Sequence, residues 1–146
     1  MSQHASVVID APAERIWSEL IDVERWPLFT ASISRVERLD QGSLHHGSRA
    51  RIKQPSLPPV VWTVTDFQPL VQFTWCVRFP GATTIATHAL SAGPSGGITL
   101  TLSIDRNGWL APVLDVFYAR LTQRYLTMEA AGMKRACEVG TASAAA

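Results

Sequence analysis

The sequence predicts an α+β fold in which a curved antiparallel sheet of about seven strands wraps around one long C-terminal helix. Short β-rich segments separated by turn residues fill the chain from residue 32 to residue 105, which is typical of an antiparallel meander. One further strand and two short helices precede them, and a long amphipathic helical pattern follows. The apolar face of the sheet needs a cover, and the long helix supplies it.

The first thirty residues predict a strand, a helix and a second, very short helix. Residues 3–10 are rich in β-branched side chains and predict the first strand. Pro12 is expected at the first helical position, where a missing N–H is tolerated, and apolar residues then recur at helical spacing up to Ile21. Asp22 is placed to cap the second helix, which ends at Pro27.

Six more strands follow, each bounded by turn residues. Alternation is clearest in two of them: Phe73, Trp75 and Val77 share one face of their strand, and Leu100 and Leu102 share one face of theirs. Each of these strands therefore has one apolar and one polar face. The expected segments are 32–40, 48–54, 60–67, 71–79, 83–92 and 98–105.

One long helix is expected after the turn at Gly108, because apolar residues repeat every three or four positions. It is expected to end near Gly140, so that residues 1–140 form a single domain and residues 141–146 a frayed tail. Gly132 inside the helix indicates close packing against the sheet. The apolar series is Leu110, Leu114, Phe117, Leu121, Tyr125, Met128 and Gly132, with polar residues such as Asp115 and Glu129 placed elsewhere around the helix.

Composition excludes several classes of protein. The 146 residues are 47% hydrophobic and 17% charged, which excludes intrinsic disorder. A net charge of +1 gives no basic surface for nucleic acid, and no apolar run approaches the ~20 residues that span a bilayer. Cys76 and Cys137 are not spaced like metal ligands, and both are expected to be reduced thiols. No signal peptide is evident in the sequence, so a cytoplasmic location is expected. The sequence contains five tryptophans, which is more large aromatic residues than a small domain needs to fill its core.

Several segments, in their order and spacing, resemble the START-like superfamily, also called Bet v 1-like, in its branch of polyketide cyclases/dehydrases and lipid transport proteins (SRPBCC). The resemblance implies a helix-grip fold with a deep cavity for an apolar ligand between the sheet and the long helix. It implies no single reaction, since this fold hosts carriers, cyclases, hydrolases and sensors. The segments are residues 9–17 (IDAPAERIW), 20–27 (LIDVERWP), Pro69 ahead of 73–75 (FTW), His88 and 97–102 (GITLTL).

Aromatic and polar residues on these elements are the candidates for lining such a cavity. An indole offers a large apolar surface and one hydrogen-bond donor, which suits a cavity wall; packing in an ordinary core is the alternative for each tryptophan. Gln54 and Thr84 are weaker candidates for orienting a ligand. The expected ligand-binding residues are Trp26, Phe29, Gln54, Trp62, Trp75, Thr84, His88, Trp109, Phe117 and Leu121.

His88 is the most informative polar candidate. Alternation leaves its face open, and the resemblance places it pointing inward. There the imidazole could orient a ligand or act as a catalytic acid or base; the alternative is a histidine satisfied by a neighbouring hydroxyl or by solvent. Arg49, Arg51 and Lys53 share a strand face that alternation places in solvent, and an inward Arg51 that anchors an anion is the alternative there.

Three functions follow from these features. The preferred one is a carrier or sensor that binds a small hydrophobic molecule, such as a lipid, an isoprenoid or an aromatic polyketide. The second is a polyketide aromatase/cyclase that uses His88 as acid or base, with Tyr118 or Tyr125 as a proton donor. The third is a protein-interaction module that uses the long helix or the loop at residues 55–59. No cofactor, metal, nucleic-acid partner or integral membrane segment is expected, and a homodimer is left open.

Overall fold

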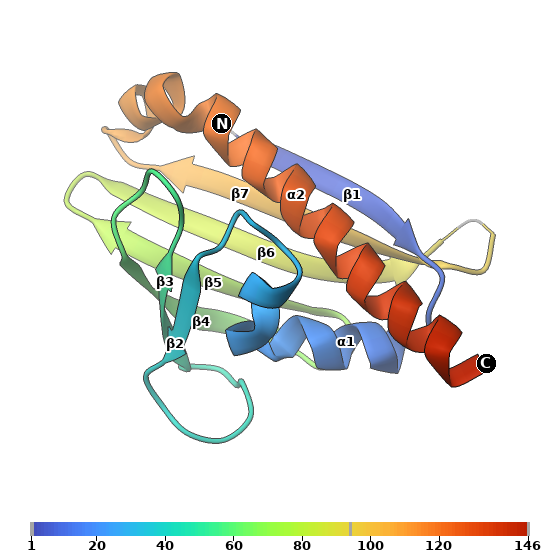
Figure 1. The fold of residues 1–146 in the computed structure, drawn as a ribbon. Helices are drawn as coiled ribbons and strands as arrows, with labels where there is room; N and C mark the ends of the chain where they lie inside the picture. The colour runs from blue at the N-terminus through green and yellow to red at the C-terminus, as the bar shows by residue number, and fades with distance from the viewer. Residues whose placement is uncertain (1, 94, 146) are drawn as a thin grey trace.

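One antiparallel sheet of seven strands runs through the part of the chain that the computed structural model describes, residues 2–93 and 95–145 (Figure 1). For residues 139–145 the description covers the backbone alone. Hydrogen-bonded neighbours follow the order β1-β7-β6-β5-β4-β3-β2, so the expected antiparallel sheet is confirmed. The strands are β1 (Ser2–Ile9), β2 (Arg35–Arg38), β3 (Arg49–Lys53), β4 (Val60–Gln68), β5 (Gln72–Phe79), β6 (Ala82–Ala92) and β7 (Ile98–Asn107).

Helices lie over one face of this sheet. They are α1 (Ala13–Ile21), the short 3₁₀ helix η1 (Val23–Leu28) and the long α2 (Ala111–Ala145). Figure 1 shows α2 running diagonally across the sheet, with α1 beside its C-terminal part. Trp17 seats α1 on the sheet, because its ring centroid lies 5.6 Å from that of Phe67. The architecture is the α+β arrangement of sheet and gripped helix that the sequence predicts.

Several element boundaries differ from expectation; β2, for example, spans Arg35–Arg38 where a strand over residues 32–40 was expected. Pro12 is the N-cap of α1 rather than its first residue, since its backbone is still extended. Asp22 stands at the N-cap of η1, but its side chain makes no capping hydrogen bond. α2 continues past Gly140 to Ala145, which agrees with the high helix propensity of its alanine-rich end. The fraying expected for residues 141–146 stays a prediction, and the last of these residues lies outside the described part of the chain.

The helices cover the apolar face of the central strands. On β5, Phe73 and Trp75 are buried on this face, as alternation predicts. The face of β6, which the sequence leaves open, is now defined: Thr84, Ala86 and His88 are buried, and the residues between them are only half-buried. The small side chains of Thr84 and Ala86 therefore face α2 at the centre of the sheet, where they fill little space.

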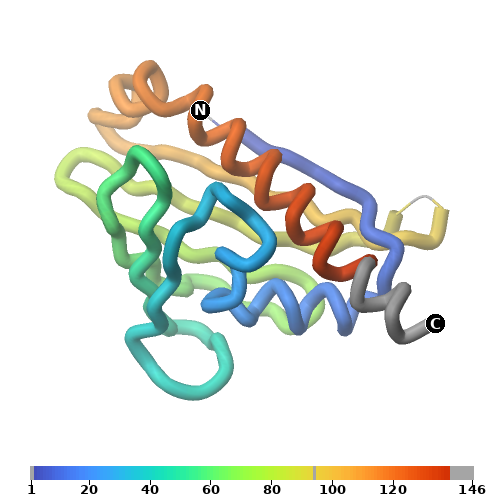
Figure 2. Tube along the Cα trace, viewed as in Figure 1, coloured from blue at the N-terminus to red at the C-terminus, as the bar shows by residue number. Residues whose placement is uncertain are grey.

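The first strand and the last helix lie side by side, with β1 next to both β7 and α2 (Figure 2). The Gln3 side-chain amide donates a hydrogen bond of 2.6 Å to the carbonyl of Ala119. Further along, Lys134 Nζ donates one of 2.6 Å to the carbonyl of Val8. These contacts fasten α2 to the edge of the sheet at two points along its length.

Gly132 lets α2 approach the residue that follows η1. A Cβ at this position would lie 2.3 Å from the carbonyl oxygen of Phe29, closer than real atoms come. The close packing that the glycine indicates is therefore present, but its partner is the backbone at Phe29 and not the sheet. Ala130 and Met133 beside it are both buried, so this part of α2 is tightly packed.

We expect Gly132→Ala to lower the free energy of unfolding by about 1–3 kcal/mol, because the added methyl group meets the Phe29 backbone. In a helix without such an obstruction, the same substitution would raise the free energy of unfolding by about 1 kcal/mol. The sign of the measured change therefore tests whether the close contact exists. Urea denaturation followed by circular dichroism measures the change, with Thr127→Ala on the exposed side of the same helix as the control. An unchanged or higher unfolding free energy for Gly132→Ala would contradict the close approach.

Candidate functional site

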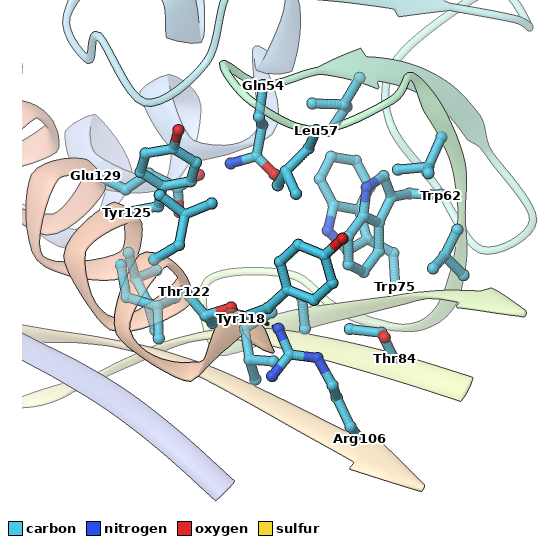
Figure 3. A pocket seen from close by; sticks show the side chains of 18 of the residues that line it. Gln54, Leu57, Trp62, Trp75, Thr84, Arg106, Tyr118, Thr122, Tyr125 and Glu129 are labelled. Atoms are coloured by element: carbon cyan, nitrogen blue, oxygen red, sulfur yellow. Dashed lines mark hydrogen bonds between the residues drawn. The ribbon is translucent and has the colours of Figure 1, made fainter. Parts of the chain in front are cut away.

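A cavity of about 410 Å³ lies between the sheet and α2 (Figure 3). Strands β3 to β7 form one side, α2 forms the other, and η1 and residues 54–58 complete the wall. Most of the lining side chains are apolar. Small-molecule pockets commonly have volumes of roughly 300–1,000 Å³, so this space is large enough for a small apolar ligand.

Three tryptophans form a continuous aromatic wall. The ring centroid of Trp75 lies 5.5 Å from that of Trp26 and 5.9 Å from that of Trp62. Phe73 meets Trp75 edge to face at 5.3 Å, a favoured aromatic geometry. Trp26 is fixed further, because its Nε1 donates a hydrogen bond of 3.2 Å to the carbonyl of Leu20. The wall is therefore a large, well-packed apolar surface.

His88 faces inward, toward this aromatic cluster, and is only 4% exposed. Its ring stacks on Phe73 with 4.3 Å between centroids and lies 5.4 Å from the ring of Trp26. Nδ1 has no hydrogen-bond partner among the described residues. Burial lowers the pKa of His88 to about 4, although the nearby backbone of Phe73 acts in the opposite direction. The imidazole is therefore neutral at pH 7.

Glu129 brings a carboxyl group from α2 to the cavity, across from Trp62 and Trp75 (Figure 3). It has neither a hydrogen bond nor an ion pair with the residues that the structure describes. Burial raises the pKa of Glu129 to about 8, so the carboxyl group is largely protonated at pH 7. The sequence prediction missed this residue because it placed Glu129 off the apolar stripe of the helix.

A second hollow, of about 10 Å³, lies between η1, the sheet and α2. Trp26, His88 and Glu129 line both this hollow and the larger cavity. Its volume is about what one water molecule needs, and His88 and Glu129 are the titratable groups beside it. Two groups whose pKa values shift in opposite directions therefore line the same small hollow.

Arg106 is the other charged residue on the wall of the cavity, and it already has partners. Its guanidinium donates to Asp115 at 3.0 Å, to the hydroxyl of Thr122 and, more weakly, to Gln3 at 3.5 Å. The side chains of Arg106 and Asp115 are each 10% exposed, so this ion pair is shielded from solvent. It joins β7 to the beginning of α2 and leaves no free positive charge at this position.

The cavity reaches the surface between the loop at residues 55–59 and the first turns of α2. Pro58 and Tyr118 line the cavity and are also exposed to solvent. Tyr125 lies further inside, where its hydroxyl donates a hydrogen bond of 2.6 Å to the carbonyl of Pro55. This bond fastens the loop to α2 beside the opening.

Seven of the ten expected ligand-binding residues line the cavity, while their contact with a ligand stays a prediction. Phe29 lines the small hollow instead. Trp109 and Phe117 were expected at the cavity, and this placement is wrong: they are 79% and 74% exposed. Trp109 precedes α2 and its ring packs beside Gly81. The seven lining residues are Trp26, Gln54, Trp62, Trp75, Thr84, His88 and Leu121.

The rotation of α2 about its own axis accounts for the exposure of Phe117. The cavity side of the helix includes Tyr118, Thr122 and Glu129, each one residue after a position of the expected apolar stripe. Steps of four residues from Leu114 lead to Tyr118 and Thr122, and would have identified this side. The bulky apolar side chain of Phe117 favoured the wrong rotation.

Charged side chains on β3 are solvated, as alternation predicts. Arg49 and Arg51 are exposed, and Arg51 forms an ion pair of 2.6 Å with Glu37, so the alternative of an inward anion anchor is wrong. In the described parts of the chain, no three His, Cys, Asp or Glu side chains are grouped so as to hold a metal ion. Over the same residues, no helix has the length and apolar character needed to cross a membrane.

The fold and the cavity between sheet and helix define a protein of the helix-grip class. The sequence profile of the family described as polyketide cyclase / dehydrase and lipid transport matches residues 2–138, and the chain belongs to this family. This confirms the START-like resemblance seen in the sequence. Comparison with curated proteins gives no match.

Solved structures share this fold at low sequence identity. The chain is similar to TTHA0849 from Thermus thermophilus, with 14% identity, a TM-score of 0.76, and coverage of 96% of this chain and 99% of the other. A START superfamily protein from Mycobacterium smegmatis shares 17% identity, with a TM-score of 0.74 and coverage of 94% and 97%. Ara h 8.0201 shares 11%, with a TM-score of 0.70 and coverage of 95% and 98%. These similarities concern the fold alone.

Replacing Glu129 is expected to change how stability depends on pH. Between pH 4.5 and 8, the folded protein keeps a proton on Glu129 that the unfolded chain has released. The free energy of unfolding therefore falls as pH rises through this window, and Glu129→Gln removes that part of the decline. At pH 8.5 the variant should be more stable than the original protein, on the order of 1–4 kcal/mol at about 1.4 kcal/mol per pKa unit.

Urea denaturation at several pH values, with ligand-free protein refolded from denaturant, measures this difference. Glu14→Gln is the matched control, because Glu14 is an exposed carboxylate on α1. Identical pH profiles for Glu129→Gln and the original protein would show that the carboxyl group is not shielded from water.

Proposed function

We propose that this protein binds a small hydrophobic molecule, such as a lipid, an isoprenoid or an aromatic polyketide, as a carrier or sensor. The observation that carries the proposal is the cavity of about 410 Å³ with three tryptophans in its wall. Membership of a family of polyketide cyclases, dehydrases and lipid transport proteins is consistent with it.

The cavity is more than a gap in a core. Protein interiors contain few voids larger than a water molecule, because unfilled space loses packing contacts. Here the chain places Thr84 and Ala86, both small, opposite α2 at the centre of the sheet. Larger apolar residues at these positions would fill the space and stabilise the fold. Their absence supports a cavity kept open for a ligand.

Filling the cavity from β6 should abolish binding. Ala86 lies on the cavity wall, and Ala86→Phe places an aromatic ring inside the space that the ligand would occupy. We expect this variant to weaken binding of apolar probes at least tenfold. Quenching of tryptophan fluorescence by a panel of fatty alcohols, isoprenoids and polycyclic aromatics measures the affinity.

Ala89→Phe is the matched control, because Ala89 lies on the same strand but on the opposite face of the sheet. It should leave affinity within twofold. If no probe of the panel binds the original protein, or if both variants bind as it does, binding in this cavity is wrong.

A cyclase or dehydratase activity is the second candidate, and one observation favours it. His88 is neutral and Glu129 is protonated at pH 7, and both line the same small hollow. Two groups whose environments shift their pKa values apart are what acid–base catalysis needs. In this scheme, His88 accepts a proton from a carbon next to one ketone, and that carbon forms a bond to the carbonyl carbon of a second ketone. Glu129 donates a proton to the oxygen of the second ketone, which becomes a hydroxyl.

Such an enzyme should lose activity when either group is replaced. Each of His88→Gln and Glu129→Gln should lower the rate of poly-β-ketone cyclisation by about 10²–10⁴-fold, while affinity for a non-reactive aromatic polyketide stays within a few-fold. Product formation followed by mass spectrometry measures the rate. Full activity in either variant would exclude that residue from the chemistry.

A further inference from the structure

We propose that the ligand of this cavity is an apolar amine, whose nitrogen donates hydrogen bonds to Glu129 while its hydrocarbon body lies along the tryptophan wall. This inference rests on the proposed binding function and names the chemical class of the ligand. It depends on the position of one carboxyl group, on the charges around it and on the nature of the facing wall.

The first step concerns the carboxyl group itself. Glu129 lines the cavity and has no hydrogen bond or ion pair with the described residues. A carboxyl group held away from water without a partner destabilises a protein, above all when it is ionised. Its raised pKa, about 8, reflects that loss of hydration. A cationic ligand would supply the missing partner and stabilise the ionised form.

The second step is the balance of charge in the cavity. Arg106, the other charged residue on the wall, is paired with Asp115 at 3.0 Å and bonded to Thr122. His88 lines the same small hollow as Glu129, but its pKa of about 4 keeps it neutral, so it provides no counter-charge at pH 7. Of the unpaired ionisable groups that line this site, His88 and Glu129, the one that can become charged between pH 7 and 8 is therefore acidic. That favours a cation and disfavours a carboxylate such as a fatty-acid anion.

The third step is the wall that the ligand would contact. Trp26 lines both the cavity and the small hollow beside Glu129, and Trp75 and Trp62 continue the wall across from the carboxyl group. The face of an indole ring attracts cations, and the interaction strengthens where water is excluded. The same wall also packs well against hydrocarbon. An aromatic wall facing a single carboxyl group therefore suits an apolar amine.

Three probes with the same chain and different end groups test the proposal: decylamine, decan-1-ol and decanoate. Isothermal titration calorimetry at pH 7, below the concentrations at which these probes form micelles, measures each affinity. Decylamine should bind at least tenfold more tightly than decan-1-ol, and decanoate should bind most weakly. Glu129→Gln should bring the affinity of decylamine to within threefold of that of decan-1-ol in the same variant.

Glu14→Gln removes one surface carboxylate and should keep the preference for the amine, which excludes a general effect of net charge. Circular dichroism and thermal melting verify that both variants fold. The amine proposal is overturned if decylamine binds no better than decan-1-ol, or if the Glu129→Gln variant still prefers decylamine. The proposed binding function survives either result if decan-1-ol binds the original protein and Ala86→Phe abolishes that binding. If none of the three probes binds, the amine proposal fails as well, and the wider apolar panel decides separately on the function.

Discussion

The contact between Gly132 and the backbone at Phe29 sets the position of α2, and the cavity depends on it. Around this contact Ala130, Met133 and Cys137 are all buried, so this half of α2 is closely packed. A helix is stiff, and its other half follows the direction that this packing imposes. Over Tyr118 to Glu129 that direction carries the helix across the small residues of β6 with open space beneath it.

The same geometry explains the unusual electrostatics of the site. His88 is held in an aromatic stack with Phe73, where its charged form would lose hydration. Glu129 hangs from a helix whose neighbouring positions are apolar, and it meets no cation there. Arg106, the basic residue of the cavity wall, is paired with Asp115. The site therefore combines buried polar groups that the protein itself leaves unsatisfied.

Most of the fold could be predicted from the sequence because it depends on local periodicity. Alternation on β5 and β7 and turn residues between strands indicated the sheet, and helical spacing indicated α2. Which face of each strand points toward the helices was harder to predict. On β6, threonine and alanine occur on both sides, so alternation alone leaves the direction of His88 open. The family resemblance predicted that His88 points inward, and its burial confirms this.

The cavity residues could be predicted only in part, because the rotation of a helix depends on its packing partners. Leu121 and Tyr125 line the cavity under either the expected or the observed rotation, whereas Phe117 and Glu129 exchange places between solvent and cavity. Hydrophobicity alone assigns the phenylalanine inside and the carboxylate outside. The observed reverse arrangement costs stability on both counts, since an apolar ring is hydrated and a carboxyl group is dehydrated.

A weakly charged sequence suggests an interior without reactive groups, and the structure changes that interpretation. What matters is not how many charges the chain carries but whether one lies in the cavity without a partner. Glu129 lies in the cavity without a partner among the described residues, and the lost hydration of its carboxyl group has two consequences. The empty protein is destabilised as pH rises, and a ligand that supplies the missing partner recovers that free energy on binding. Under the proposed amine binding, the carboxyl group that weakens the fold would also make the cavity selective; groups with strongly shifted pKa values often cluster at functional sites.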